Sequence, residues 1–294
     1  MNRPKALTFF LTVLSLPVLG VSYAQAQEAN PAHPGTLNYI EGSASIDGRY
    51  IPRHAANAPV LEPGHTLATG QGRVEMLLTP GVFLRFDNSS AGRLISGDLT
   101  NTVVELDSGR ASVEVDQIFP QNNIQIIEQG NPTRILKPGF YEFDADHGGV
   151  RVFEGKAELV NHGTARVTEN GHHEYAFDDQ SDLKPRDFDT KASLDPLYEW
   201  SSLRSEYLAQ ANTQIAGQYG YAGFAPGWYW DPYVYGYTYI GLDPFWSPFG
   251  WGFYGGGLYG RGFYGGFGGH GFGGYGGRGG YGGGGFHGGG GGRR

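Results

Sequence analysis

The sequence predicts an all-β fold, an antiparallel β-sandwich or barrel-like domain of many short strands, followed by one amphipathic helix and a disordered glycine-rich tail. Three observations predict this arrangement. Short apolar or alternating runs, separated by glycine-containing turns, recur roughly every eight to twelve positions over residues 36–180. Apolar residues near position 200 recur at helical spacing. Of the 51 glycines, 33 lie between residues 217 and 294.

The composition separates an acidic body from a weakly basic tail. The whole chain has 294 residues and a formal charge of −8; the part before Gly217 has a net charge of −10 and the rest +2. Only the body mixes aliphatic, charged and turn residues in the way that builds a core. The absence of cysteine excludes disulfides, thiolate metal sites and cysteine nucleophiles.

Residues 1–26 have the pattern of a secretory signal peptide. A basic start precedes an apolar run over residues 6–21, and small residues precede two cleavage positions, after Ala24 or after Ala26. The alternative is an uncleaved anchor, but the run is short for a span and contains a proline and a glycine. We therefore expect an exported protein of the periplasm or cell surface, without a transmembrane span after cleavage.

The predicted β-domain covers residues 36–180. Its turns place glycine where a positive φ is needed, as in Thr79-Pro80-Gly81. In the run 111–115, aliphatic and polar residues alternate, so we expect one face to pack in the core and the other to contact water. The predicted strands are 37–40, 74–78, 82–86, 102–106, 111–115, 124–127, 133–136, 140–143, 150–153, 157–160, 165–168 and 174–177.

A polar connector and an amphipathic helix are predicted over residues 181–217. Asp195 is a suitable N-cap, Pro196 suits the first helical position and Gly217 is a stop signal. A helix docked on the β-domain is the favoured interpretation, and a partner-binding helix is the alternative. The apolar stripe consists of Leu197, Trp200, Leu203, Tyr207, Leu208, Ala211 and Ile215.

The C-terminal region divides into an aromatic and proline-rich segment, 218–254, and a glycine-rich segment, 255–294. The second has too few aliphatic residues to fold, so we expect it to be disordered. The first either packs on the body or stays exposed as an adhesive surface. The candidate partner surface consists of Trp200, Tyr207, Trp228, Trp230, Trp246 and Trp251.

No catalytic, cofactor-binding or metal-binding residues are predicted, and we expect no enzyme activity. The nine histidines lack metal-site spacing, and Asp144-x-Asp146 begins like a calcium loop but has glycine at its fifth and twelfth positions. A single Arg-Gly-Gly element around Arg278 in an acidic exported chain is weak support for nucleic-acid binding, which we do not expect.

Four stretches of the body resemble the FecR domain: 62–70, 72–86, 104–115 and 150–159. The resemblance covers residues 36–177 and implies an all-β extracytoplasmic module for protein or ligand interaction. Segments around Trp200 and Trp228 also resemble an extension found in exported FecR-domain proteins. Regulators of this family carry a cytoplasmic segment before a membrane span, whereas five residues precede the apolar run here. Direct sigma-factor control is therefore not expected.

Three functional hypotheses follow. The first is a non-enzymatic extracytoplasmic binding or sensing module that takes part in signalling through an envelope protein. The second is a structural envelope protein whose tail attaches to cell-wall polymer, to polysaccharide or to its own copies. The third is an enzyme with an unrecognised pair of carboxylates.

Overall fold

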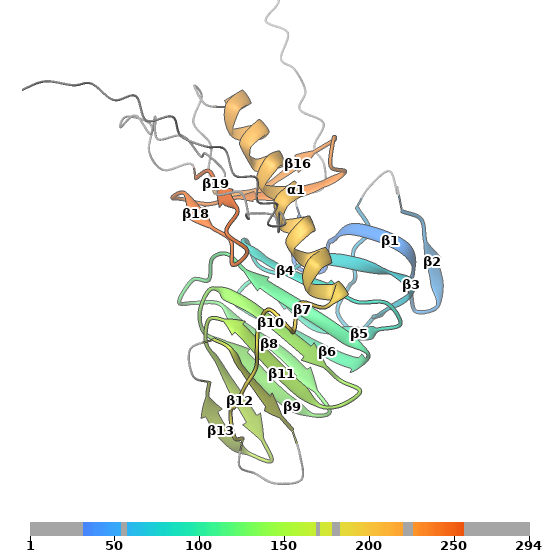
Figure 1. Ribbon diagram of the computed structural model, residues 1–294. Helices are drawn as coiled ribbons and strands as arrows, with labels where there is room; N and C mark the ends of the chain where they lie inside the picture. Colours follow the sequence, from blue (N-terminus) through green and yellow to red (C-terminus); the bar gives the residue numbers. More distant parts are fainter. Residues whose placement is uncertain (1–31, 54–57, 169–170, 178–182, 220–225, 256–294) are drawn as a thin grey trace, which may run out of the picture. The chain divides into compact units, whose positions relative to one another are not determined.

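Figure 1 shows the computed structural model, which describes residues 32–53, 58–168, 171–177, 183–219 and 226–255. The all-β prediction is confirmed, because strands form most of the described chain and α1 (Pro196–Tyr219) is its one helix. The predicted signal peptide and the predicted tail after Gly255 lie outside the described residues. Within the described part of the chain, no helix combines the length and the apolar character needed to cross a bilayer.

The β-domain is built from fifteen strands in one hydrogen-bonded sheet. They are β1 (Leu37–Ile46), β2 (Arg49–Ile51), β3 (Thr66–Leu77), β4 (Val82–Phe86), β5 (Ala91–Asp98), β6 (Asn101–Ser108), β7 (Arg110–Val115), β8 (Asn123–Glu128), β9 (Asn131–Ile135), β10 (Gly139–Asp144), β11 (Gly149–Glu154), β12 (Ala157–Asn161), β13 (Thr164–Val167), β14 (His173–Ala176) and β15 (Arg186–Asp187).

The long strand β3 divides this sheet into two layers. Its residues 66–68 pair with β5, and its residues 74–77 pair with β4. The front layer continues from β4 through β7, β10, β11 and β14 to β15, and the back layer runs from β5 through β6, β8, β9 and β12 to β13. Apolar side chains of both layers form a single core, which includes Met76, Val113 and Val152 from one side and Leu94, Val104 and Ile126 from the other.

Two glycines permit a close approach of β1 and β3 between the halves of β3. Gly42 and Gly72 are register partners, with φ angles of 75° and 144°. A Cβ atom on either residue would lie 1.9 Å from a backbone oxygen of the opposite strand. Only glycine fits there, because any side chain would push the two strands apart.

One strand pair departs from the antiparallel pattern. β6 and β8 run parallel, in register from Asn101 opposite Asn123 to Leu106 opposite Glu128. Between them the chain leaves the back layer to form β7 in the front layer and then returns. A parallel pair requires such a crossover, and a strand in the other layer provides it here.

Helix α1 covers part of the outer face of the front layer, where it contacts β7 (Figure 1). The predicted cap is present, since Asp195 Oδ1 accepts hydrogen bonds from the backbone N–H groups of Leu197 and Tyr198, both at 3.0 Å. Five residues of the predicted stripe are buried, but Leu203 and Tyr207 are 45% and 44% exposed. The face of the helix toward the sheet also contains polar residues: Ser201, Arg204 and Ser205 are all buried.

This docking corrects the prediction that one face of the run 111–115 contacts water. Ser112 and Glu114 are fully buried beneath α1, where Ser112 meets Ser201 at 3.0 Å and Glu114 accepts a hydrogen bond from Ser205 at 2.6 Å. Both faces of β7 are therefore covered, one by the core and the other by a polar helix face.

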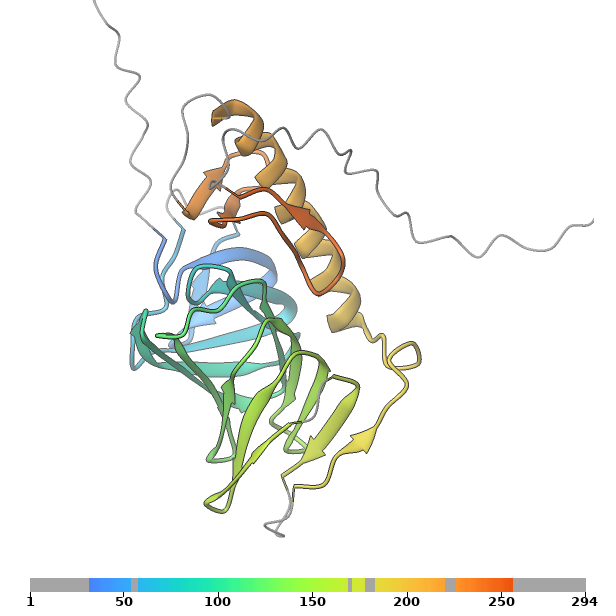
Figure 2. The ribbon, with the colours of Figure 1, turned by 90° about the vertical axis from the view of Figure 1, so that its left-hand side faces the viewer.

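The aromatic segment completes the fold with two hairpins. They are formed by β16 (Gly227–Asp231) with β17 (Gly236–Ile240), and by β18 (Phe245–Trp246) with β19 (Gly252–Phe253). Figure 2 shows both hairpins beside α1. They build a second core, whose buried members are Leu77, Phe83, Leu208, Ala209, Tyr237, Tyr239 and Phe253.

Candidate functional site

Three of the six aromatic residues predicted as a partner surface have structural contacts instead. Trp200 is 7% exposed, and its Nε1 donates to the Glu41 carboxylate at 2.7 Å. Trp228 is partly buried and packs edge-on against Phe83. Trp251 is also partly buried, and its Nε1 donates to the Ser202 carbonyl at 3.2 Å. These three residues hold the helix and hairpins in place.

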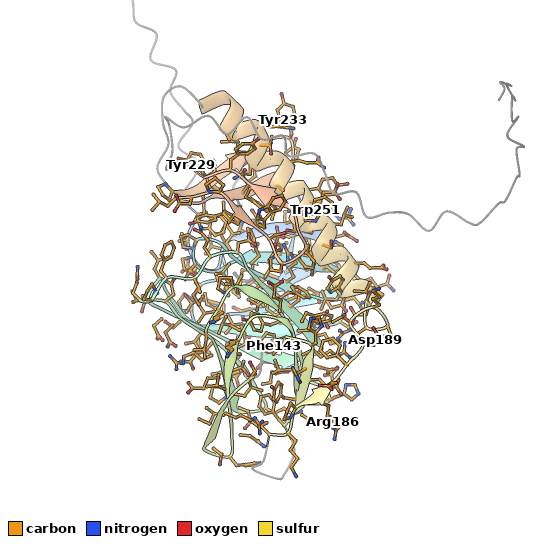
Figure 3. All side chains as sticks on the ribbon, turned by 60° about the vertical axis from the view of Figure 1, so that its left-hand side comes forward. Phe143, Arg186, Asp189, Tyr229, Tyr233 and Trp251 are labelled. Atoms are coloured by element: carbon orange, nitrogen blue, oxygen red, sulfur yellow. The ribbon has the colours of Figure 1, made fainter. Side chains whose placement is uncertain are left out.

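The other three lie on separate elements and are more exposed. Tyr207 is on α1, Trp230 is 36% exposed on β16 and Trp246 is 62% exposed on β18. Tyr233 and Tyr235, in the turn after Trp230, were not among the predicted residues and are 81% and 59% exposed. Figure 3 shows Tyr229, Tyr233 and Trp251 around α1, and Arg186 on β15 at the other end of the β-domain.

A buried ionic network joins α1 to the front layer. Arg85 Nε donates to Glu75 at 2.8 Å, Arg85 Nη1 lies 2.5 Å from Glu114, and Arg204 Nη2 donates to Glu75 at 2.9 Å. The side chains of Glu75, Arg85 and Glu114 have no solvent exposure, and Arg204 has 4%. Asn38 adds a hydrogen bond to Glu75 at 2.8 Å.

In this network, the attraction between opposite charges offsets the cost of removing the charged groups from water. Burial alone would raise the pKa of Glu75, but Arg204 and Arg85 lower it to about 2. For the neighbouring Asp116 the balance is reversed: burial, the largest effect, and Glu114 raise its pKa well above the usual range against the weaker opposing effect of Arg85. The network therefore fixes the helix on the sheet, and its groups are closed to a ligand.

An open site lies on the same outer face of the front layer, across β10, β11, β14 and β15. It is a cavity of about 350 Å³, which we call the arginine hollow. Its floor contains a cross-strand row of alternating charge: Glu142 pairs in register with Arg151, Arg151 with Glu174, and Glu174 with Arg186. The remaining lining residues are Arg110, Phe143, Asp144, His147, Gly148, Gly149, Val150, Tyr175 and Ala176.

The centre of the hollow is open because the next cross-strand row has small residues on β11 and β14. Gly149 and Ala176 are register partners and place almost no side-chain volume above the sheet. The turn between β10 and β11 forms one wall, and Asp144 Oδ1 closes this turn by accepting from the backbone N–H groups of Asp146 and His147 at 3.1 Å each. The Asp-x-Asp pattern is thus part of a turn.

Glu142 is the buried acid of the hollow. Its side chain is 2% exposed; Oε2 accepts from Arg110 at 3.1 Å and from Arg151 at 3.3 Å. Oε1 has no hydrogen-bond partner among the described residues. Burial is the largest effect and, with the nearby charge of Asp195, raises the pKa of Glu142 to about 8 against the opposing effect of the two arginines. At neutral pH this carboxyl is therefore mostly protonated.

Asp195 connects the hollow to α1. One of its oxygens caps the helix, while Oδ2 accepts a hydrogen bond from Arg110 and lies 3.5 Å from Arg151 Nη1. The same carboxylate thus stabilises the first turn of the helix and balances the arginines of the hollow. Figure 2 shows the segment that leads from β15 to the start of α1 beside the β-domain.

The lining of the hollow is suited to binding. Among its described residues there is no serine, threonine or cysteine that could act as a nucleophile. His147 is highly exposed, and its ring Nδ1 contacts Asp144. The guanidinium groups of Arg110, Arg151 and Arg186 provide planar hydrogen-bond donors.

Comparisons with known proteins find little similarity. No family model and no curated protein matches the chain. Two crystal structures, each described provisionally as an anti-sigma factor from Parabacteroides distasonis, are similar at 13% and 12% identity, both with a TM-score of 0.37. Each alignment covers 43% of this chain and 61% of the other, so the chain spans about three-fifths of those proteins. The FecR resemblance of the sequence has no matching family model.

Proposed function

We propose that this protein is a non-enzymatic binding or sensing module of the cell envelope, in which the arginine hollow takes a ligand and α1 transmits its presence. The observation that carries the proposal is the position of Asp195, which caps α1 and contacts two arginines that line the hollow. A ligand that engages these arginines competes with Asp195, so binding changes the stability of the first helical turn.

Binding is the activity that the hollow supports best. Cavities for small molecules are typically 300–1,000 Å³ in volume and contain a few placed polar groups, and the hollow is of this kind. Its perturbed acid, Glu142, has no serine, threonine or cysteine beside it among the lining residues. A raised pKa in a cleft also occurs in binding sites, where it adjusts the charge that a ligand meets.

The helix is a suitable element for relaying the bound state to a partner. Its inner face is fixed by the buried network, whereas Leu203 and Tyr207 remain exposed on its outer face. The N-terminal turn depends on Asp195 and so on the arginines of the hollow. A partner that contacts the outer face near this end would detect a change of the first turn.

The exposed aromatic residues favour a second candidate, a structural protein that adheres to cell-wall polymer or polysaccharide. Trp230, Tyr233 and Tyr235 lie close together in sequence around the turn between β16 and β17, and all three are exposed. Exposed aromatic side chains supply large contact areas with a polar handle. In this alternative, retention depends on the aromatic turn and the hollow has no part.

Cell fractionation followed by crosslinking and pull-down distinguishes the two candidates. The full chain is compared with Arg151→Gln in the hollow and with a double variant, Tyr233→Ser and Tyr235→Ser, in the aromatic turn. Capture of a protein partner that fails in Arg151→Gln and persists in the tyrosine variant supports the binding module. Wall retention that is lost only in the tyrosine variant supports the structural protein and contradicts our proposal.

A further inference from the structure

We propose that the arginine hollow binds a small molecule carrying a carboxylate or phosphate group, held chiefly by Arg151 and Arg186. This inference rests on the proposed binding function and names the ligand class. It depends on three features of the hollow: guanidinium N–H groups without an acceptor, carboxylate oxygens that are engaged by neighbouring groups, and enough space for a small molecule.

The donors come from two guanidinium groups on neighbouring parts of the floor. Among the described residues, Arg151 makes one hydrogen bond, from Nη1 to Glu142 at 3.3 Å; Nη1 also lies 3.5 Å from Asp195, and Nε lies 3.9 Å from Glu174. Arg186 lines the hollow and makes no ion pair within the described part of the chain. A guanidinium group has five N–H donors in a planar fork that matches the two oxygens of a carboxylate or phosphate.

Three of the acidic side chains at the hollow, Asp144, Asp195 and Glu142, are engaged by neighbouring groups. Asp144 accepts from two backbone N–H groups of its own turn and contacts His147. Asp195 accepts hydrogen bonds from the first turn of α1 and from Arg110. Glu142 binds both arginines through Oε2, and in its protonated form it does not repel an anion. An anionic group therefore finds unused donors on Arg151 and Arg186. Glu174, which lies 3.9 Å from Arg151 Nε, and Glu142 Oε1 are the acceptors left for other polar groups of the ligand.

The space above the floor accommodates a small organic molecule. Gly149 and Ala176 leave the centre of the cavity open, with Arg110 and Glu142 on one side and Arg186 on the other. A volume of about 350 Å³ exceeds what a single ion needs and lies at the low end of the range for small-molecule sites. We expect the anionic group to be one part of a larger polar ligand.

The test is an NMR titration of the full chain with malonate, with inorganic phosphate and, as a neutral isostere, with malonamide. Saturable shifts of the Gly148, Gly149 and Ala176 amides with malonate or phosphate, and none with malonamide, are expected. Malonate alone would identify a carboxylate ligand, and phosphate alone a phosphorylated one. Equal shifts with malonamide, or no saturable shift with any probe, would overturn the inference.

Two variants and a control make the test specific. Arg186→Gln, at an exposed position, should weaken binding by about tenfold because a charge-assisted contact is lost. Ala176→Trp should abolish binding by filling the hollow without removing a charge. Arg134→Gln removes an exposed arginine of β9, outside the hollow, and should leave binding unchanged.

Unchanged titrations in both hollow variants would place the anion elsewhere and refute the inference. The proposed function fails separately. If no probe binds but the crosslinked partner is still lost in Arg151→Gln, the hollow is a binding site for another class of ligand, and only the oxyanion inference falls.

Discussion

Arg204 on α1 and Glu75 on β3 form a 2.9 Å ion pair in which both side chains are almost completely buried. The two residues are 129 positions apart in the chain. The guanidinium group of Arg204 also lies over the ring of Tyr39, 4.0 Å from its centroid. This contact combines charge pairing with a cation–π interaction and joins the helix to the start of the β-domain.

Removal of Arg204 is expected to destabilise the protein strongly. Arg204→Met leaves part of the Glu75 charge buried without compensation, and the loss of one member of a buried pair typically costs about 3–5 kcal/mol of unfolding free energy. Urea unfolding measures the change. The matched control is Arg134→Met, which breaks an exposed ion pair with Glu158 and should cost less than about 1 kcal/mol. Similar losses in both variants would contradict the structural role of the network.

Removal of the Trp200 side chain is expected to lower the unfolding free energy strongly, whereas removal of the Trp246 side chain is not. Trp200→Ala removes a buried ring and leaves Glu41 without its indole donor, so we expect a loss of about 3–5 kcal/mol. Trp246 is 62% exposed, and Trp246→Ala should change the unfolding free energy by less than about 0.5 kcal/mol. Chemical denaturation of the two variants decides between a docked helix and the alternative of a free partner-binding helix. A near-zero effect of Trp200→Ala would favour the alternative.

Stability should fall as the pH rises from about 5 to 8. Burial raises the pKa of Glu128 to about 8 from its usual value near 4.5. The folded state therefore holds a proton that the unfolded state releases, and its contribution, complete below pH 4.5, is lost as the pH rises through 8. The slope from this one group is at most about 1.4 kcal/mol per pH unit.

The variant Glu128→Gln isolates this effect, because glutamine keeps the shape of the side chain and does not titrate. Glu128 is not among the residues that line the hollow, so the variant removes no side chain of the proposed site. Urea unfolding at pH 5, 6, 7 and 8 should give a flatter dependence for the variant. Equal slopes for the two proteins would mean that Glu128 is ionised in the folded state.

The two hairpins should be required for folding. A chain that ends at Gly217 lacks β16 to β19 and exposes Leu77, Phe83 and Leu208, which the hairpins bury. We expect it to lose at least about 3 kcal/mol, the lower range for removing one large buried aromatic residue. A chain that ends at Gly257 keeps both hairpins and should unfold at the temperature of the full chain. Thermal denaturation tests both, and a stable shorter chain would contradict this account.

The sequence predicts the features that depend on local patterns. Strand alternation and glycine turns predict the all-β domain, and the Asp195-Pro196 pair predicts the helix start, because capping involves residues only two or three positions apart. The burial of Trp200 follows from helical spacing. Leu203 shares that spacing but lies exposed, since the inner face of α1 follows the polar groups of the sheet instead.

The buried network and the hollow depend on distant strand pairings that the sequence does not reveal. Glu114 in an alternating run has the appearance of a solvent-facing residue, and only the docked helix buries it. The charged row of the hollow requires β11 to pair with β14 and β14 with β15. No local periodicity specifies those registers, so the sequence does not predict that Arg151 and Arg186 line the same site.

Hydrogen exchange of the Leu197 and Tyr198 amides in the full chain shows whether the hollow communicates with α1 through Asp195. Exchange is measured with saturating malonate or phosphate, whichever probe binds, and without it. We expect several-fold faster exchange of both amides on binding, because Asp195 loses arginine contacts that hold the cap in place. Unchanged exchange at both amides, with the hollow occupied, would contradict the claim.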